Sequence, residues 1–245
     1  MSVVIVTGGA RGIGLAYVKG LAERGHSIVV ADLADGSEAV AAAKAAGAEA
    51  VAVGVDISDE AATARMAEET LERFGRIDGL VNNAGYFTQI HKKPFDQLTV
   101  EEWDRAFAVN VRGTWLCCKA VVPSMREQGE GRIINTSSMT VPTGIPGFLH
   151  YVSSKSAIVG LTRSLARELG DDGIAVNTVS PDYIPHDEDY AGRQPEMAEF
   201  IRNQRAFRRD QIPEDMVGVV AFLLSPDSSF ITGQNFYVNG GRWFG

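Results

Sequence analysis

The residue pair with the clearest chemical potential is a tyrosine and a lysine four positions apart, in Tyr151-Val152-Ser153-Ser154-Lys155. On a helix this spacing places Tyr151 and Lys155 on one face, about one turn apart. A phenol with a pKa of about 10 is a poor base at neutral pH, but a neighbouring ammonium group favours the phenolate and lowers that pKa. The pair therefore suits general acid/base catalysis. An exposed tyrosine–lysine pair without a catalytic role would have the same spacing.

A serine pair precedes the tyrosine and follows the apolar segment Arg132–Asn135. The hydroxyl of Ser138, at the end of that segment, could polarise a substrate oxygen. Ser137 is its neighbour, and only the alternation of side chains along the chain separates the two.

A glycine-rich turn, Thr7-Gly8-Gly9-Ala10-Arg11-Gly12-Ile13-Gly14, lies close to the N-terminus. Glycines let the backbone turn sharply and let a pyrophosphate approach the N-terminus of the following helix, where amide donors and the helix dipole favour negative charge. A plain strand-to-helix turn is the alternative. The position after the first apolar segment favours a dinucleotide-binding turn.

Asp32 ends the second apolar segment and bears on the choice of dinucleotide. A carboxylate there can accept a hydrogen bond from the ribose 2′-hydroxyl of NAD and repels the 2′-phosphate of NADP. Arg11 is the opposing feature, because its charge could pair with that phosphate. A buried like-charge contact costs more than one exposed arginine contributes. We therefore expect NAD rather than NADP.

The elements that position these residues alternate between apolar β-branched segments and helical periodicity, which is typical of a Rossmann-type doubly wound α/β fold with a parallel sheet and helices on both faces. The chain of 245 residues is expected to form a single domain, 1–245. The expected strands are Val3–Val6, Ser27–Ala31, Ala50–Val55, Gly79–Val81, Arg132–Asn135, Ile174–Val179 and Asn235–Val238. The expected helices are Ile13–Arg24, Ser37–Ala46, Asp59–Phe74, Thr99–Met125, His150–Leu169 and Pro213–Leu224, with a capping box at Thr99 and Glu102.

Composition limits the partners. The net charge of −8 argues against nucleic acid and anionic membranes, both of which favour basic surfaces. No apolar run is long enough to span a bilayer. The N-terminus enters a strand without a basic region, so we expect no signal peptide and a cytoplasmic location. Cys117 and Cys118 are expected to be buried thiols in a reducing compartment.

Taken together, the motifs show that the whole chain resembles a single-domain member of the short-chain dehydrogenase/reductase family. The motifs that carry this resemblance, in order, are Thr7–Gly14, Asp56-Ile57, Asn82-Asn83-Ala84-Gly85, Asn110, Ser138, Tyr151 with Lys155, and Asn239-Gly240-Gly241.

The resemblance implies four catalytic residues. Tyr151 would be the acid/base, Ser138 would donate to the substrate oxygen, and Lys155 would lower the tyrosine pKa and bind the ribose. Asn110 would hold a water molecule in a proton relay. The other implied cofactor contacts are Gly8, Arg11, Gly12, Ile13, Gly14, Asp32, Asp56, Ile57, Asn83, Ala84, Gly85, Pro181 and Ile184. Members of this type commonly form homotetramers, which here would use the helices Thr99–Met125 and His150–Leu169, with the Trp243-Phe244 tail near a subunit boundary.

One departure from the family pattern follows the sixth strand. Asp182 stands where the family usually has glycine, and His186 stands where it usually has threonine. A carboxylate at Asp182 could favour the positively charged oxidised nicotinamide, or it could turn to solvent or cap a backbone turn.

A substrate lid is expected at about 182–210. A helix from about Pro195 to Arg208 would turn its apolar face inward and its arginines mainly outward. The acidic cluster His186-Asp187-Glu188-Asp189 is interpreted as a solvated part of this lid, and no metal is expected.

These features predict an NAD-dependent oxidoreductase that interconverts a secondary alcohol and a ketone. An apolar, aromatic wall of Tyr86, Phe87, Met139, Thr140, Phe148 and Tyr183 suggests a hydrophobic or ring-bearing small molecule. Two alternatives stay open: a non-catalytic nucleotide-binding scaffold of the same fold, and an epimerase or dehydratase that works through a transient hydride. The intact set of catalytic residues argues against the first, and the short chain against the second.

Overall fold

In the computed structural model, which describes residues 2–185 and 195–244, seven strands form one parallel sheet in the order β3-β2-β1-β4-β5-β6-β7. The order reverses between β1 and β4, and the carboxyl ends of the strands on either side of such a switch point leave a crevice for ligands. The strands are β1 Val3–Thr7, β2 Ser27–Asp32, β3 Ala50–Gly54, β4 Gly79–Asn82, β5 Gly131–Thr136, β6 Ile174–Pro181 and β7 Asn235–Val238.

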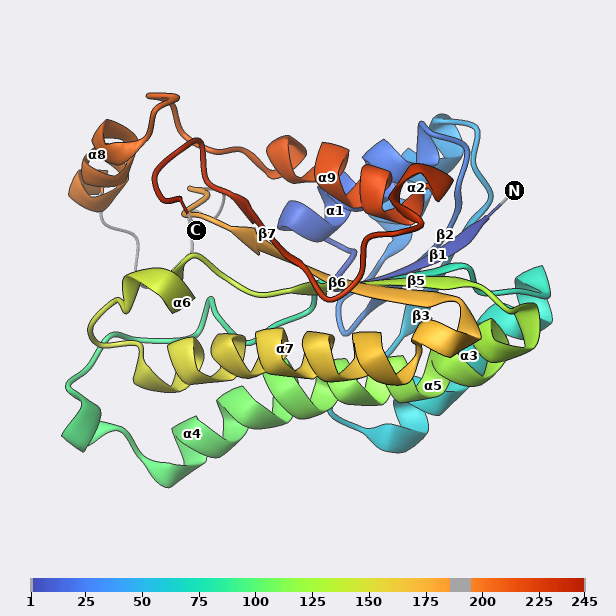
Figure 1. Cartoon of the computed structure of the whole chain (residues 1–245), viewed down its shortest axis with the longest axis horizontal. Coiled ribbons are helices and arrows are strands. Elements are labelled where there is room, and N and C mark those ends of the chain that lie inside the picture. Colours follow the sequence, from blue (N-terminus) through green and yellow to red (C-terminus); the bar gives the residue numbers. More distant parts are fainter. Residues whose placement is uncertain (1, 186–194, 245) are drawn as a thin grey trace.

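Helices cover both faces of the sheet (Figure 1). One face carries α1 Gly12–Ala22, α2 Ser37–Ala45 and α9 Val217–Leu224, and the other carries α3 Glu60–Phe74, α5 Thr114–Gln128 and α7 Leu149–Glu168. Successive residues of β1 alternate between the two cores: Ile5 packs in one, whereas Val4 and Val6 pack in the other. Burial on both faces explains why the strands are apolar throughout. The single-domain doubly wound fold expected from the sequence is confirmed.

The expected helix Thr99–Met125 is interrupted. α4 Val100–Phe107 is followed by a π-helical turn, η2 Ala108–Gly113, and only then by α5. The capping box is present, because Glu102 N donates to Thr99 Oγ1 and Thr99 N donates to the Glu102 carboxylate. A π-helical turn takes up an extra residue and often lies at a functional site. Here it contains Asn110.

The expected lid helix is shorter than predicted. α8 covers Pro195–Gln204 rather than extending to Arg208. Its inner face is also narrower, because Ile201 is buried whereas Phe200 and Phe207 are exposed. Arg205, which follows the helix, is buried rather than solvated. The expectations for His186–Asp189 lie outside the described residues.

The remaining short elements are the helix α6 Thr140–Thr143 and the 3₁₀ turns η1 Phe95–Gln97, η3 Gly170–Asp172, η4 Pro213–Met216 and η5 Pro226–Ser228. Cys117 and Cys118 are buried free thiols, as expected, and burial raises the pKa of both. Within residues 2–185 and 195–244 no helix combines the length and apolar character needed to cross a membrane.

Candidate active site

A groove lies at the switch point of the sheet, where the strands β1, β2 and β4 end. Of the residues that the sequence assigns to the cofactor, all except Gly14 and Ile184 line this groove. They are Gly8, Arg11, Gly12, Ile13, Asp32, Asp56, Ile57, Asn83, Ala84, Gly85, Tyr151, Lys155 and Pro181.

The glycine turn brings α1 close to the end of β1. Gly8 and Gly12 have positive φ angles of 64° and 55°, which other residues rarely adopt. A Cβ atom on Gly14 would clash with the carbonyl oxygen of Gly8, so this glycine is required by packing and not by the groove. The first turn of α1 has no side-chain cap among the described residues. Its amide groups are therefore suited to a phosphate.

Asp32 is fixed against the same turn. Its carboxylate accepts hydrogen bonds from the backbone amides of Ala10 and Ala34, at 2.9 and 3.0 Å. Arg11 is exposed at the rim of the groove. The Asp32 carboxylate is thus fixed in the groove wall, whereas the Arg11 guanidinium is exposed to solvent.

The strand β4 is tied to the glycine turn by Asn83. Its side-chain amide donates to the carbonyl oxygens of Thr7 and Gly8, both at 3.1 Å. Beyond β3, the carboxylate of Asp56 accepts from the backbone amide and the hydroxyl of Ser58, and these bonds lower the pKa of Asp56. Asp56 is consequently an ionised acceptor at the far end of the groove.

Near its start, α7 places Tyr151 and Lys155 side by side, as the spacing predicts. Both side chains are buried, and the Lys155 ammonium lies 5.9 Å from the centroid of the Tyr151 ring. Lys155 Nζ also donates to the carbonyl oxygen of Thr136 at 2.8 Å. Burial lowers the pKa of Lys155 to about 8. A buried cation this close to the phenol favours its ionised form.

The structure separates the two serines. Ser137 donates its hydroxyl hydrogen to the carbonyl oxygen of Lys155 and holds α7 against β5. Ser138 lines the same cavity as Tyr151, and its oxygen accepts from the backbone amide of Thr140 at 3.1 Å. Within residues 2–185 and 195–244 no acceptor is recorded for the Ser138 hydroxyl hydrogen, so this hydroxyl can donate to a molecule in the cavity.

Asn110 lies on the π-helical turn; it is fully buried and is not among the residues that line the groove or the cavity. Its Oδ1 accepts from Tyr86 N at 2.7 Å, and its Nδ2 donates to Ser154 Oγ at 3.0 Å. Its carbonyl oxygen accepts from Thr114. The side chain therefore joins the segment after β4 to α7, and the backbone carbonyl oxygen is held by the Thr114 hydroxyl.

A second cavity of about 150 Å³ adjoins the groove, and Tyr151 lines both. Most of the wall predicted from the sequence is present, namely Phe87, Met139, Thr140, Phe148 and Tyr183, together with Ile184. Tyr86 lines the groove and not the cavity, because its backbone is bonded to Asn110. Met197 and Ile201 of α8 also line the cavity, on the helix whose apolar face was expected to turn inward. Other lining residues, among them Lys92, Ile145 and Arg242, were missed by sequence reasoning.

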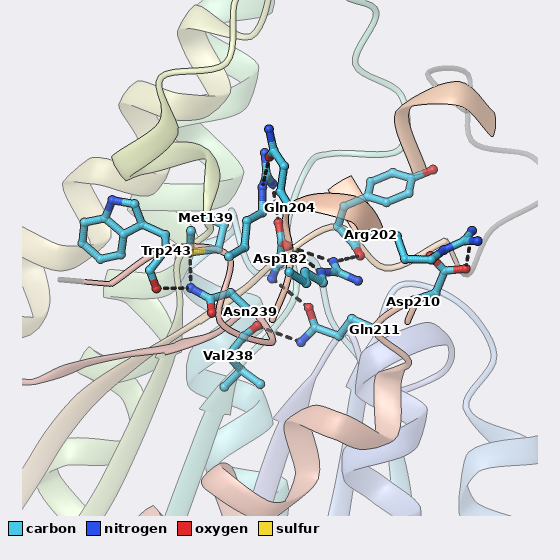
Figure 2. A network of polar contacts seen from close by, with 12 residues as sticks. Met139, Asp182, Arg202, Gln204, Asp210, Gln211, Val238, Asn239 and Trp243 are labelled. Atoms are coloured by element: carbon cyan, nitrogen blue, oxygen red, sulfur yellow. Dashed lines mark hydrogen bonds and ion pairs between the residues drawn. The ribbon is translucent and has the colours of Figure 1, made fainter. Parts of the chain in front are cut away.

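Asp182 lies at the centre of a buried polar network beside this cavity (Figure 2). Its Oδ2 accepts from Arg205 Nε and Nη2 at 3.0 and 2.9 Å, and its Oδ1 accepts from Arg242 Nη1 at 2.7 Å. The side chains of Asp182 and Arg205 are each only 2% exposed. The alternative in which Asp182 turns to solvent is therefore wrong. Any effect of its negative charge on a nicotinamide ring would be opposed by the two guanidinium groups of Arg205 and Arg242.

Two glycines near the C-terminus make room for this network. Gly240 and Gly241 have φ angles of 62° and 77°. Added Cβ atoms would lie 3.3 Å from Arg205 Cδ and 2.7 Å from Ala206 Cβ. The tail can therefore pass directly over Arg205 before Arg242 turns back to Asp182. Trp243 then packs edge-on against Tyr237, with ring centroids 4.6 Å apart.

Comparison with known proteins agrees with this architecture. A family model described as enoyl-(acyl carrier protein) reductase matches residues 8–242. The short-chain reductase protein NovJ of Streptomyces niveus is 38% identical, over 98% of this chain and 94% of that protein. The 3-oxoacyl-[acyl-carrier-protein] reductase FabG of Staphylococcus aureus (strain Mu50) is 36% identical, over 98% of this chain and 97% of that protein. A solved structure of NAD⁺-bound xylitol dehydrogenase superimposes with a TM-score of 0.92 at 35% identity, over 98% of both chains.

Proposed function

Because the chain belongs to the short-chain dehydrogenase/reductase family, we propose that it is an NAD-dependent oxidoreductase that interconverts a secondary alcohol and a ketone. The observation that carries the proposal is the position of Tyr151, which lines both the dinucleotide groove and the apolar cavity. An acid/base that lines both can contact a substrate in the cavity beside a dinucleotide in the groove. The aromatic wall supports a hydrophobic or ring-bearing substrate.

The residues of the groove fit the dinucleotide. The first turn of α1 would hold the pyrophosphate, Asp32 the adenosine ribose, Asp56 and Ile57 the adenine, and Lys155 the second ribose. Pro181 and Ile184 would pack beside the nicotinamide. NAD, when bound, would supply the nicotinamide ring that accepts a hydride from the alcohol carbon. A carboxylate at Asp32 is the reason for proposing NAD over NADP.

In alcohol oxidation the protein's own groups handle the proton. Ser138 donates a hydrogen bond to the substrate oxygen, and Tyr151 Oη accepts the proton of the substrate hydroxyl. The Lys155 ammonium stabilises the phenolate that performs this step. A water on the Asn110 carbonyl returns the proton towards solvent. Ketone reduction uses the same groups in reverse, with Tyr151 as the acid.

The proposal includes a homotetramer. A shallow hollow on the surface of α4, η2, α5 and α7 is lined by Phe107, Val111, Trp115 and Leu161. Trp115 is 45% exposed there, so part of a large apolar side chain lies at the surface of this hollow. A second subunit would bury this surface.

The test is turnover of ring-bearing secondary alcohols with NAD, followed as NADH absorbance. Tyr151→Phe should lower kcat by about 10²–10⁴-fold and leave the NADH dissociation constant unchanged, since it removes only the proton carrier. Tyr237→Phe, outside the groove and the cavity, serves as the matched control. NADP should give a lower kcat/KM than NAD, and Asp32→Ala should narrow that difference. A Tyr151→Phe enzyme with more than a tenth of wild-type turnover would contradict the mechanism.

A further inference from the structure

The positive and negative charges of the side chains around the apolar cavity do not cancel. Among the described residues, the side chains of full charge that line it are Lys92, Asp182 and Arg242. Lys92 is exposed, whereas Asp182 is buried and shared between Arg242 and Arg205. One carboxylate thus faces two guanidinium groups. The buried cluster Asp182–Arg205–Arg242 has a net charge of +1.

The unbalanced charge lies at Arg242 and not at Arg205. Arg205 does not line the cavity, and each of its three nitrogens already donates: Nε and Nη2 to Asp182, Nη1 to the Arg209 carbonyl, and Nη2 also to the Tyr183 carbonyl. Arg242 does line the cavity. Its Nε donates to Gln204 and its Nη1 to Asp182, and no hydrogen bond within residues 2–185 and 195–244 uses its Nη2.

The Arg242 guanidinium is held in place before any ligand arrives. Gln204, at the end of α8, and Asp182, after β6, fix it from two segments, and its side chain is only 10% exposed. A guanidinium that is fixed and partly desolvated binds a carboxylate with charge-assisted hydrogen bonds and little loss of entropy. A net charge of +1 is neutralised by a single negative charge. A phosphate dianion would leave excess negative charge in an apolar wall.

The same cavity holds the groups of the reaction. Ser138 and Tyr151 line it together with Arg242, so a single molecule in the cavity can present an alcohol carbon to Tyr151 and an anion to Arg242. Thr140 also lines it, and its Oγ1 is buried without a hydrogen-bond partner in the described part of the chain. Buried hydroxyl groups are normally paired.

We propose that the cavity binds a hydrophobic hydroxy acid or oxo acid whose free carboxylate pairs with Arg242. This inference rests on the oxidoreductase function proposed above and adds the substrate class. Asp182 and Gln204 are positioning residues for Arg242. The aromatic wall accommodates the body of the acid between its carboxylate and the carbon next to Tyr151.

The test is calorimetric titration of the full-length protein, saturated with NADH, with 3-phenylpropanoate and with its methyl ester as a neutral match. The carboxylate should bind roughly tenfold more tightly or better, the value of one charge-assisted contact. Arg242→Gln should abolish this preference by lowering the affinity for the carboxylate and not for the ester. Arg242→Lys should restore part of the preference. The Asp182–Arg205 contact survives in both variants. Arg202→Gln, an ion-paired arginine on α8 outside the cavity wall, is the control.

Three results would overturn the inference. They are equal binding of acid and ester by the wild type, an equal loss of both in Arg242→Gln, and a loss of NADH affinity in that variant. Turnover of 3-hydroxy-3-phenylpropanoate and its methyl ester with NAD separates the two proposals. If the ester is oxidised as well as the acid, the substrate class is wrong and the oxidoreductase function stands. If Arg242-dependent acid binding persists but no secondary alcohol reduces NAD, the function is wrong and an anion site remains.

Discussion

Removing the charge of Asp182 should destabilise the fold far more than removing an exposed carboxylate. Asp182→Asn keeps one acceptor oxygen and the shape of the side chain but leaves two arginines without a counter-charge. Arg205 is 2% exposed in its side chain and cannot regain water without moving the end of α8. An unpaired buried charge is among the most unfavourable outcomes of a single substitution.

The magnitude follows from the geometry. Arg205 Nη2 lies 2.9 Å from Asp182 Oδ2, and loss of one partner of a buried pair costs about 3–5 kcal/mol. Arg205 keeps its hydrogen bonds to the carbonyl oxygens of Tyr183 and Arg209, which places the loss at the lower end, about 3 kcal/mol. For a chain of this size that loss corresponds to a fall in Tm of about 6–12 °C.

Urea unfolding at equilibrium, followed by circular dichroism, measures the change in the free energy of unfolding. Asp172→Asn is the matched control, because the Arg126–Asp172 pair is exposed and should contribute less than about 1 kcal/mol. The double variant Asp182→Asn/Arg205→Met removes one of the two stranded charges and should recover about half of the loss. A loss of less than about 1 kcal/mol in Asp182→Asn, equal to the control, would refute the reasoning.

Two further predictions concern the buried lysine and the assembly. The pKa of Lys155, lowered to about 8 by burial, lies below its unfolded value near 10.5, so the folded state carries a penalty that is full below pH 8 and is relieved as the pH rises from 8 to 10.5. Lys155→Met should therefore stabilise the cofactor-free protein by up to about 3 kcal/mol at pH 7, and by less at pH 10, while it abolishes turnover. Denaturation at both pH values checks this, and an unchanged or lower stability at pH 7 would contradict it. Light scattering should give a tetramer mass that falls in Trp115→Glu, whereas a wild-type monomer at micromolar concentration would exclude the assembly.

The sheet and most helices were predictable because their signals are local. Strands buried on both faces must be apolar, and helices packed on one face must repeat their apolar residues every three or four positions. The same applies to Tyr151 and Lys155, whose spacing determines their relation on any helix. The interruption at Asn110 has no comparable signal. A π-helical turn within Ala108–Gly113 is a property of how the helix packs, so the sequence predicted one unbroken helix.

The substrate side was less predictable, because contacts there join distant segments. Arg205 looks like one of four arginines on a polar face, and only the fold shows that it is buried while Arg208 and Arg209 are exposed. Phe200 and Phe207 have the spacing of an inward-facing pair, yet α8 ends between them and leaves both exposed. Nothing local to Arg242 indicates a place in the cavity wall.

The aspartate that stands at position 182 in place of the family's glycine therefore depends on residues elsewhere in the chain. A glycine at this position would need no counter-charge, whereas a buried aspartate requires cations from elsewhere in the chain. Arg205 and Asp182 join the two ends of the segment 182–205, and Arg242 reaches them only because Gly240 and Gly241 let the tail cross over Arg205. Restoring the family glycine alone would strand both arginines. The three charged residues consequently act as one unit, and the charge they do not neutralise is that of Arg242, which lines the cavity.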